Sequence, residues 1–191
     1  MYNGRIMWLG FIIATMLLFA VTPAFAGLIG QSATGDLEFG GFSGVNFFDP
    51  ANGFVPIGYP NSAGPTVTLV TGVDFAYSDA FSNIQVAFTD NTVELIEYPS
   101  LSGGGCCTAD WTMTFSGLTG ITGLNLNSDN FSALTFGFDC CSLSVTYGGG
   151  DTLGSLDAKF SVSSVPEPAS LILVGTGLGA FALLLRRVRL A

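Results

Sequence analysis

Apolar and polar residues alternate in eight short segments of this 191-residue chain, and this pattern constrains the fold more than any other feature. A period of two places apolar side chains on one face of a strand and polar side chains on the other. Valine, threonine and aromatic residues, which favour strands, are frequent in these segments. The predicted strands are 66–70, 73–77, 84–88, 92–97, 111–115, 134–138, 143–147 and 158–162.

Clusters of glycine, asparagine, aspartate and serine separate these strands at intervals of roughly ten residues, which is typical of turns in an antiparallel sheet. The spacing predicts an all-β fold, an antiparallel sandwich or jelly roll, over residues 27–162. Within residues 28–65, only Leu37–Phe39 resembles a clean strand. We expect a long ordered loop there, anchored by Phe42, Phe47 and Phe54.

The N-terminus has the pattern of a secretory signal. Arg5 precedes an apolar run that ends before Pro23, and Ala24 and Ala26 are the small residues that a signal peptidase recognises. Residues 1–26 are therefore a predicted signal peptide, cleaved after Ala26. An uncleaved membrane anchor is the alternative interpretation.

The C-terminus combines a short polar motif, an apolar run and a basic end. Residues 163–168 form a predicted tether, and residues 169–191 a predicted transmembrane helix with a basic tail. The apolar run of about 15 residues is slightly short for a bilayer, a difference that arginine snorkelling absorbs. Arginines stay in the cytoplasm, so everything before the helix is expected outside the inner membrane. The alternative is a buried core helix. The motif residues are Val165, Pro166, Glu167 and Pro168, and the basic residues are Arg186, Arg187 and Arg189.

Residues 165–191 resemble a PEP-CTERM sorting signal of Gram-negative bacteria in the motif, the glycine-interrupted helix and the arginines. The resemblance implies that a membrane-embedded exosortase-type enzyme recognises Pro-Glu-Pro and removes the helix. It also implies a place at the cell surface or in an exopolysaccharide or biofilm matrix. It implies no fold and no activity for residues 27–164.

Residues 27–164 carry 13 acidic residues and one basic residue, Lys159, which gives a formal charge of −12. A partner rich in phosphate needs lysine and arginine for charge neutralisation, so nucleic acid is excluded. A neutral glycan, or an acidic one bridged by divalent cations, remains open as a partner. A solvated acidic surface is the alternative.

The cysteines form two adjacent pairs, Cys106 with Cys107 and Cys140 with Cys141. Export favours disulfides, and we expect bridges between the two pairs because bonding within a pair closes a strained ring. A zinc site of four thiolates is the alternative, although adjacent cysteines lack the usual spacer.

The chain offers few side chains that could act in catalysis. The chain contains no histidine, so Ser-His-Asp and Cys-His catalysis are excluded. Glu94 and Glu97 are three residues apart on a predicted strand and face opposite sides, which disfavours a carboxylate pair. We therefore expect no enzymatic activity. Trp111 is either a platform for stacking on sugars or a core residue.

Calcium is the ligand ion that the sequence suggests best. Residues 125–130 offer several oxygen ligands within one predicted turn, and the weak candidates are Asn127, Asp129 and Asp151. Ordinary turn hydrogen bonding is the alternative, and no other cofactor is expected. The combined prediction is a non-enzymatic exported protein with a structural or adhesive role. A lectin-like, possibly calcium-dependent carbohydrate-binding module is the second hypothesis.

Overall fold

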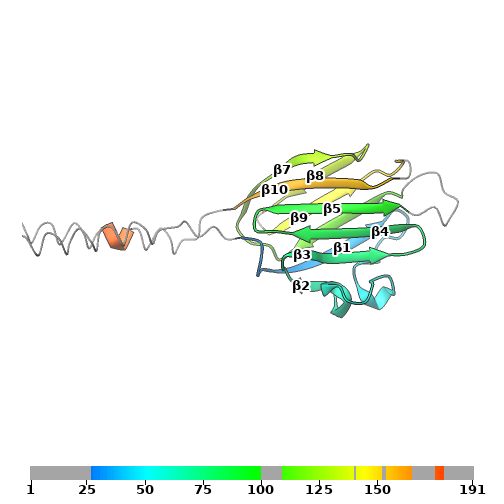
Figure 1. Ribbon diagram of the computed structural model, residues 1–191, viewed down its shortest axis with the longest axis horizontal. Helices are drawn as coiled ribbons and strands as arrows, with labels where there is room; N and C mark the ends of the chain where they lie inside the picture. Colours follow the sequence, from blue (N-terminus) through cyan, green and yellow to red (C-terminus); the bar gives the residue numbers. More distant parts are fainter. Residues whose placement is uncertain (1–26, 100–108, 140, 152–153, 165–174, 179–191) are drawn as a thin grey trace, which may run out of the picture. The chain divides into compact units, whose positions relative to one another are not determined.

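Two antiparallel β-sheets of five strands each pack face to face in the computed structural model (Figure 1). The structure describes residues 27–99, 109–139, 141–151, 154–164 and 175–178. The chain divides into two compact units, Ala26–Val165 and a second one comprising Met1–Phe25 and Pro166–Ala191. The two sheets lie in the first unit.

The first sheet has the strand order β2-β1-β6-β9-β8 and the second has the order β3-β4-β5-β10-β7. The strands of the first sheet are β1 (Ser32–Phe39), β2 (Thr66–Thr68), β6 (Trp111–Ser116), β8 (Leu134–Phe138) and β9 (Ser142–Tyr147). Those of the second are β3 (Gly72–Ser78), β4 (Ser82–Phe88), β5 (Thr92–Pro99), β7 (Ile121–Asp129) and β10 (Leu156–Ser164). The predicted all-β sandwich is confirmed, and all eight predicted strands are present.

β1 was predicted only over Leu37–Phe39, and β7 was not predicted as a strand. In β1 the inward positions include Ala33 and Gly35, which are too small to create an apolar signal. Position 35 requires glycine, because a Cβ there would lie 2.5 Å from the ring of Phe75 in the opposite sheet. The predicted loop therefore contains a complete eight-residue strand, and its irregular parts are residues 28–31 and 40–65.

Residues 40–65 contain two short 3₁₀ turns, η1 (Pro50–Asn52) and η2 (Pro60–Ala63). Phe47 is buried as expected, and the ring of Phe54 packs 5.3 Å from it. Phe42 is 59 % exposed, and its ring makes an edge contact with Phe47 at 5.9 Å. This third expected anchor therefore packs at the surface of the loop.

Aromatic rings fill the centre of the sandwich. Phe75 and Phe88 of the second sheet and Phe115 of the first are fully buried, and their ring centroids lie 5.2 to 6.2 Å apart. Burying one such side chain contributes about 1.5–3 kcal/mol to folding. The two sheets are thus joined mainly by apolar contact.

Tight turns beginning with an aspartate close two of the hairpins. In the β8–β9 turn, Oδ1 of Asp139 accepts hydrogen bonds from the N–H groups of Cys141 at 2.9 Å and Ser142 at 2.7 Å. These bonds lower the pKa of Asp139. Asp79 makes the same contacts between β3 and β4. Cys141 is exposed in its turn. Cys106, Cys107 and Cys140 lie outside the described residues, so the expected bridges between the cysteine pairs stay a prediction.

The predicted signal peptide, 1–26, and the sorting motif Val165–Pro168 also lie outside the described residues. Of the predicted C-terminal helix, only residues 175–178 are described, and they are helical. Within the described ranges, no helix is both long and apolar enough to cross a membrane.

Candidate functional site

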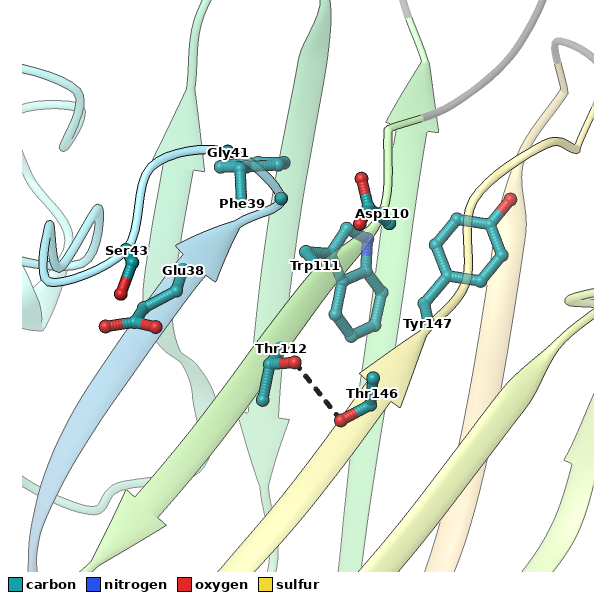
Figure 2. Close-up of a pocket in the computed structure, with 10 residues that line it drawn as sticks. Glu38, Phe39, Gly41, Ser43, Asp110, Trp111, Thr112, Thr146 and Tyr147 are labelled. Carbon is teal, nitrogen blue, oxygen red and sulfur yellow. Dashed lines mark hydrogen bonds between the residues drawn. The ribbon is translucent and has the colours of Figure 1, made fainter.

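An open pocket of about 210 Å³ lies at the end of the first sheet, where β1 ends and β6 begins. Figure 2 shows its lining side chains converging from β1, the loop after it, β6 and β9. The lining residues are Glu38, Phe39, Gly40, Gly41, Ser43, Asp110, Trp111, Thr112, Thr146 and Tyr147.

Strand register creates the polar wall of this pocket. Glu38 of β1 pairs with Thr112 of β6, which in turn pairs with Thr146 of β9. Paired residues project from the same face of a sheet, so one carboxylate and two hydroxyls form a row on the outer face. The two threonine hydroxyls are hydrogen-bonded to each other at 3.2 Å (Figure 2).

Two carboxylates, those of Glu38 and Asp110, stand at the rim. Oε1 of Glu38 accepts the N–H of Gly44 at 3.0 Å, which ties the loop after β1 to the strand. The N–H of Gly40 donates to the carbonyl of Asp110 at 3.0 Å. A side chain at Gly40 would collide with the carboxylate of Asp110, so glycine allows this carboxylate to lie against the loop.

Trp111 forms the inner wall and is only 2 % exposed. Its ring packs against Phe131 and Tyr147 at centroid distances of 5.9 and 5.4 Å. A sugar platform needs an exposed ring face, so the hypothesis of a stacking platform is wrong and the core alternative is confirmed.

Glu97 lies behind Trp111 and is 1 % exposed. Its carboxylate accepts hydrogen bonds from the indole N–H of Trp111 at 3.0 Å and from the hydroxyl of Ser82 at 2.8 Å. Burial raises the pKa of Glu97, and these two bonds partly oppose the increase. Glu94 projects to the opposite side of the strand, as the spacing predicted. Its carboxylate lies 4.0 Å from the ammonium group of Lys159. The two glutamates are not brought together.

The weak calcium candidates lie on different elements. Residues 125–129 belong to β7, so the predicted turn is wrong. Leu124 and Leu126 point toward the core while the polar residues between and after them are exposed. Asn127 accepts a hydrogen bond from the hydroxyl of Ser161 at 3.0 Å. Within the part of the chain that the structure describes, no three acidic or cysteine side chains form a metal-binding group.

Asp151 has a local structural role. Oδ2 accepts hydrogen bonds from the N–H of Ser132 at 2.8 Å and from the hydroxyl of Tyr147 at 2.9 Å. These contacts lower the pKa of its carboxyl group. Calcium binding by Asn127, Asp129 or Asp151 stays a prediction.

The sequence did not single out Glu38 or Thr146, and it pointed to Asp110 and Thr112 only as the neighbours of Trp111. The only available signal was the alternation that places Glu38 and Thr112 on the polar faces of their strands. Their convergence depends on pairing between β1 and β6, which are more than seventy residues apart in the chain.

The first unit is thus a β-sandwich with an open pocket at the end of its first sheet. The PEP-CTERM protein-sorting motif matches residues 164–188, and no family is assigned to the rest of the chain. The motif begins at the last residue of β10, Ser164. It implies exosortase-dependent sorting of an exported protein that is anchored at the membrane before processing. No curated protein matches this chain.

Proposed function

We propose that the mature sandwich is a non-enzymatic component of the cell surface or of an exopolysaccharide matrix, with a structural or adhesive role. The observation that carries this proposal is the direct succession of β10 and the sorting motif, because the sandwich is then the part that sorting delivers. The formal charge of −12 favours solubility outside the cell and disfavours direct pairing with anionic polymers.

Two experiments in the native host test this proposal. Fractionation of the wild type is expected to recover the protein from the surface or the matrix. Deletion of its gene is expected to weaken matrix cohesion or surface attachment. Recovery only from the cytoplasm, or an unchanged matrix and attachment, would contradict the proposal. A variant with Pro166→Ala and Pro168→Ala separates failed sorting from failed function.

The second candidate is a lectin-like module, and the pocket favours it. Carboxylates accept hydrogen bonds from sugar hydroxyls, and the hydroxyls of Thr112 and Thr146 can donate or accept. The described residues that line the pocket include no cation. The chemistry of this lining therefore fits a neutral, hydroxyl-rich ligand.

Retention of the protein on neutral polysaccharide from its host tests this second candidate. Glu38→Gln and Asp110→Asn are expected to weaken binding at least tenfold, because each replaces a charged acceptor with a weaker neutral one. Glu94→Gln, which removes a carboxylate from the opposite sheet, is the matched control and should bind normally. Equal binding by all three variants would exclude the pocket, and added calcium with chelator as reference tests ion bridging.

A further inference from the structure

The edge strand β8 has an unpaired outer side and an apolar inner side. In the described residues, β8 pairs only with β9. Its inward side chains Phe136 and Phe138 are 41 % and 43 % exposed, although the ring of Phe136 packs 5.3 Å from Phe160. Figure 1 shows β7 and β8 together along one side of the sandwich, opposite β2 and β3. The core is incompletely covered on this side.

The other three edge strands carry features that discourage pairing. β2 has only three residues. On β3, the side-chain amide of Asn61 donates to the carbonyl of Ala76 at 3.0 Å and accepts its N–H at 3.1 Å, which occupies that edge. β7 is interrupted by two register shifts against β10 and ends at Asp129. Short length, blocked backbone groups, bulges and charge are the devices by which proteins avoid edge pairing. Among the residues that the structure describes, β8 shows none of the last three.

The sequence of β8, Leu134-Thr135-Phe136-Gly137-Phe138, is complementary to itself in an antiparallel pair. With Phe136 opposite Phe136 of a second copy, Leu134 lies opposite Phe138, and these pairs share the inward face. On the outward face, Thr135 lies opposite Gly137. We infer that β8 is a homotypic assembly edge, and that its partner is β8 of a second copy of this chain.

The formal charge of −12 on residues 27–164 makes two copies of this chain repel each other. Two copies can therefore associate only through surfaces on which no carboxylates face each other. β8 has no charged residue, and Asp139 directly after it would lie opposite Ala133 of the second copy. Pairing would join two five-stranded sheets and cover Phe136 and Phe138, which is β-strand addition between identical edges.

Pairing through β8 would link neighbouring copies at the surface and so extends the structural role proposed above. Only the biological role of this pairing, and not the pairing itself, rests on the proposed function. Its tests read out association between copies. A monomeric protein that still reached the matrix and strengthened it would refute the inference and leave the proposed function standing.

Cysteine trapping in the full-length chain, exported by its native host, tests the register. In this register, position 135 of one copy lies opposite position 137 of the other. The double variant Thr135→Cys/Gly137→Cys therefore brings new cysteines of the two copies together. A covalent dimer is therefore expected on a non-reducing gel, well above the wild-type level set by the four natural cysteines. Each single variant should stay at that level. The control Asn125→Cys/Asn127→Cys has the same spacing on β7 and should also stay there. Absence of the dimer from the Thr135→Cys/Gly137→Cys variant, or equal trapping in the control, would overturn the inference.

Sedimentation of the purified wild-type and variant proteins gives a second measurement. Thr135→Glu/Gly137→Glu brings glutamates opposite each other and is expected to raise the dimer dissociation constant at least tenfold. Both positions face outward, and a Cβ at Gly137 meets only Ser144 at an ordinary 3.4 Å, so folding should be preserved. Asn125→Glu/Asn127→Glu adds the same charge to β7 as a control. Equal weakening in both variants, or no association of the wild type at surface concentrations, would contradict pairing through β8.

Discussion

The indole N–H of Trp111 donates a hydrogen bond to Oε2 of Glu97 across the interior of the sandwich, at 3.0 Å. Trp111 begins β6 in one sheet, and Glu97 lies on β5 in the other. Because both side chains are almost fully buried, this bond fixes the relative position of the two sheets beside the pocket. It also explains how a carboxylate persists in an apolar core.

Replacing Glu97 separates the role of its hydrogen bonds from that of its charge. Glu97→Gln can accept from Trp111 and donate to the hydroxyl of Ser82, so we expect stability at pH 7 equal to or above wild type. Glu97→Ala leaves both partners unsatisfied in the core and should cost about 2–4 kcal/mol. Thermal and denaturant unfolding of the purified protein checks both values. A severe loss in the glutamine variant would mean that the charge itself is required.

Stability should increase as the pH falls from 7 toward the ordinary titration range of carboxyl groups. Burial raises the pKa of Glu97, Asp74 and Asp36, so the folded state holds these protons to higher pH than the unfolded chain. Stability is then lost as the pH rises from the ordinary carboxyl range through the raised pKa values. Melting temperatures measured across this range should fall as the pH rises. The slope should be shallower for Glu97→Gln. A flat profile, or one unaffected by this substitution, would argue against the assignment.

Gly35 is required by the close approach of Phe75. Gly35→Ala should destabilise the protein by about 1–3 kcal/mol, because the added methyl group overlaps the ring. Phe75→Leu should also be destabilising, but the double variant should lose less than the sum of the two single losses. Strict additivity in this double-mutant cycle would show that the two residues are not in steric conflict.

Asn61 protects the edge of β3 and is fully buried. Asn61→Ala removes its bonds to the backbone of Ala76 and to the carbonyl of Phe48, at an expected cost of about 2–4 kcal/mol. Exposed Ser62→Ala, next in the chain, should be nearly neutral. Unfolding and aggregation should be measured together, since an opened edge of β3 should increase aggregation. An Asn61→Ala variant as stable and soluble as Ser62→Ala would contradict it.

Local alternation was sufficient to predict eight strands, because their apolar positions are large and regularly spaced. The prediction of β1 was incomplete because position 35 is a glycine, which gives no apolar signal. Glycine is needed there because the ring of Phe75 in the other sheet lies too close for a Cβ, and no local pattern reveals this contact. β7 was mistaken for a turn because its asparagine and serine residues are also frequent in turns. The pocket was beyond prediction, since Glu38 and Thr112 meet only through the pairing of distant strands.

Exosortase-type processing would deliver this sandwich outside the cell and separate it from the apolar C-terminal segment. Mass spectrometry of the mature protein from the surface of its native host tests this most directly. We expect an N-terminus at Gly27 and a C-terminus close to Pro166–Ala169. A mature chain that still ends beyond Arg189 would contradict processing and would define a permanently anchored protein instead.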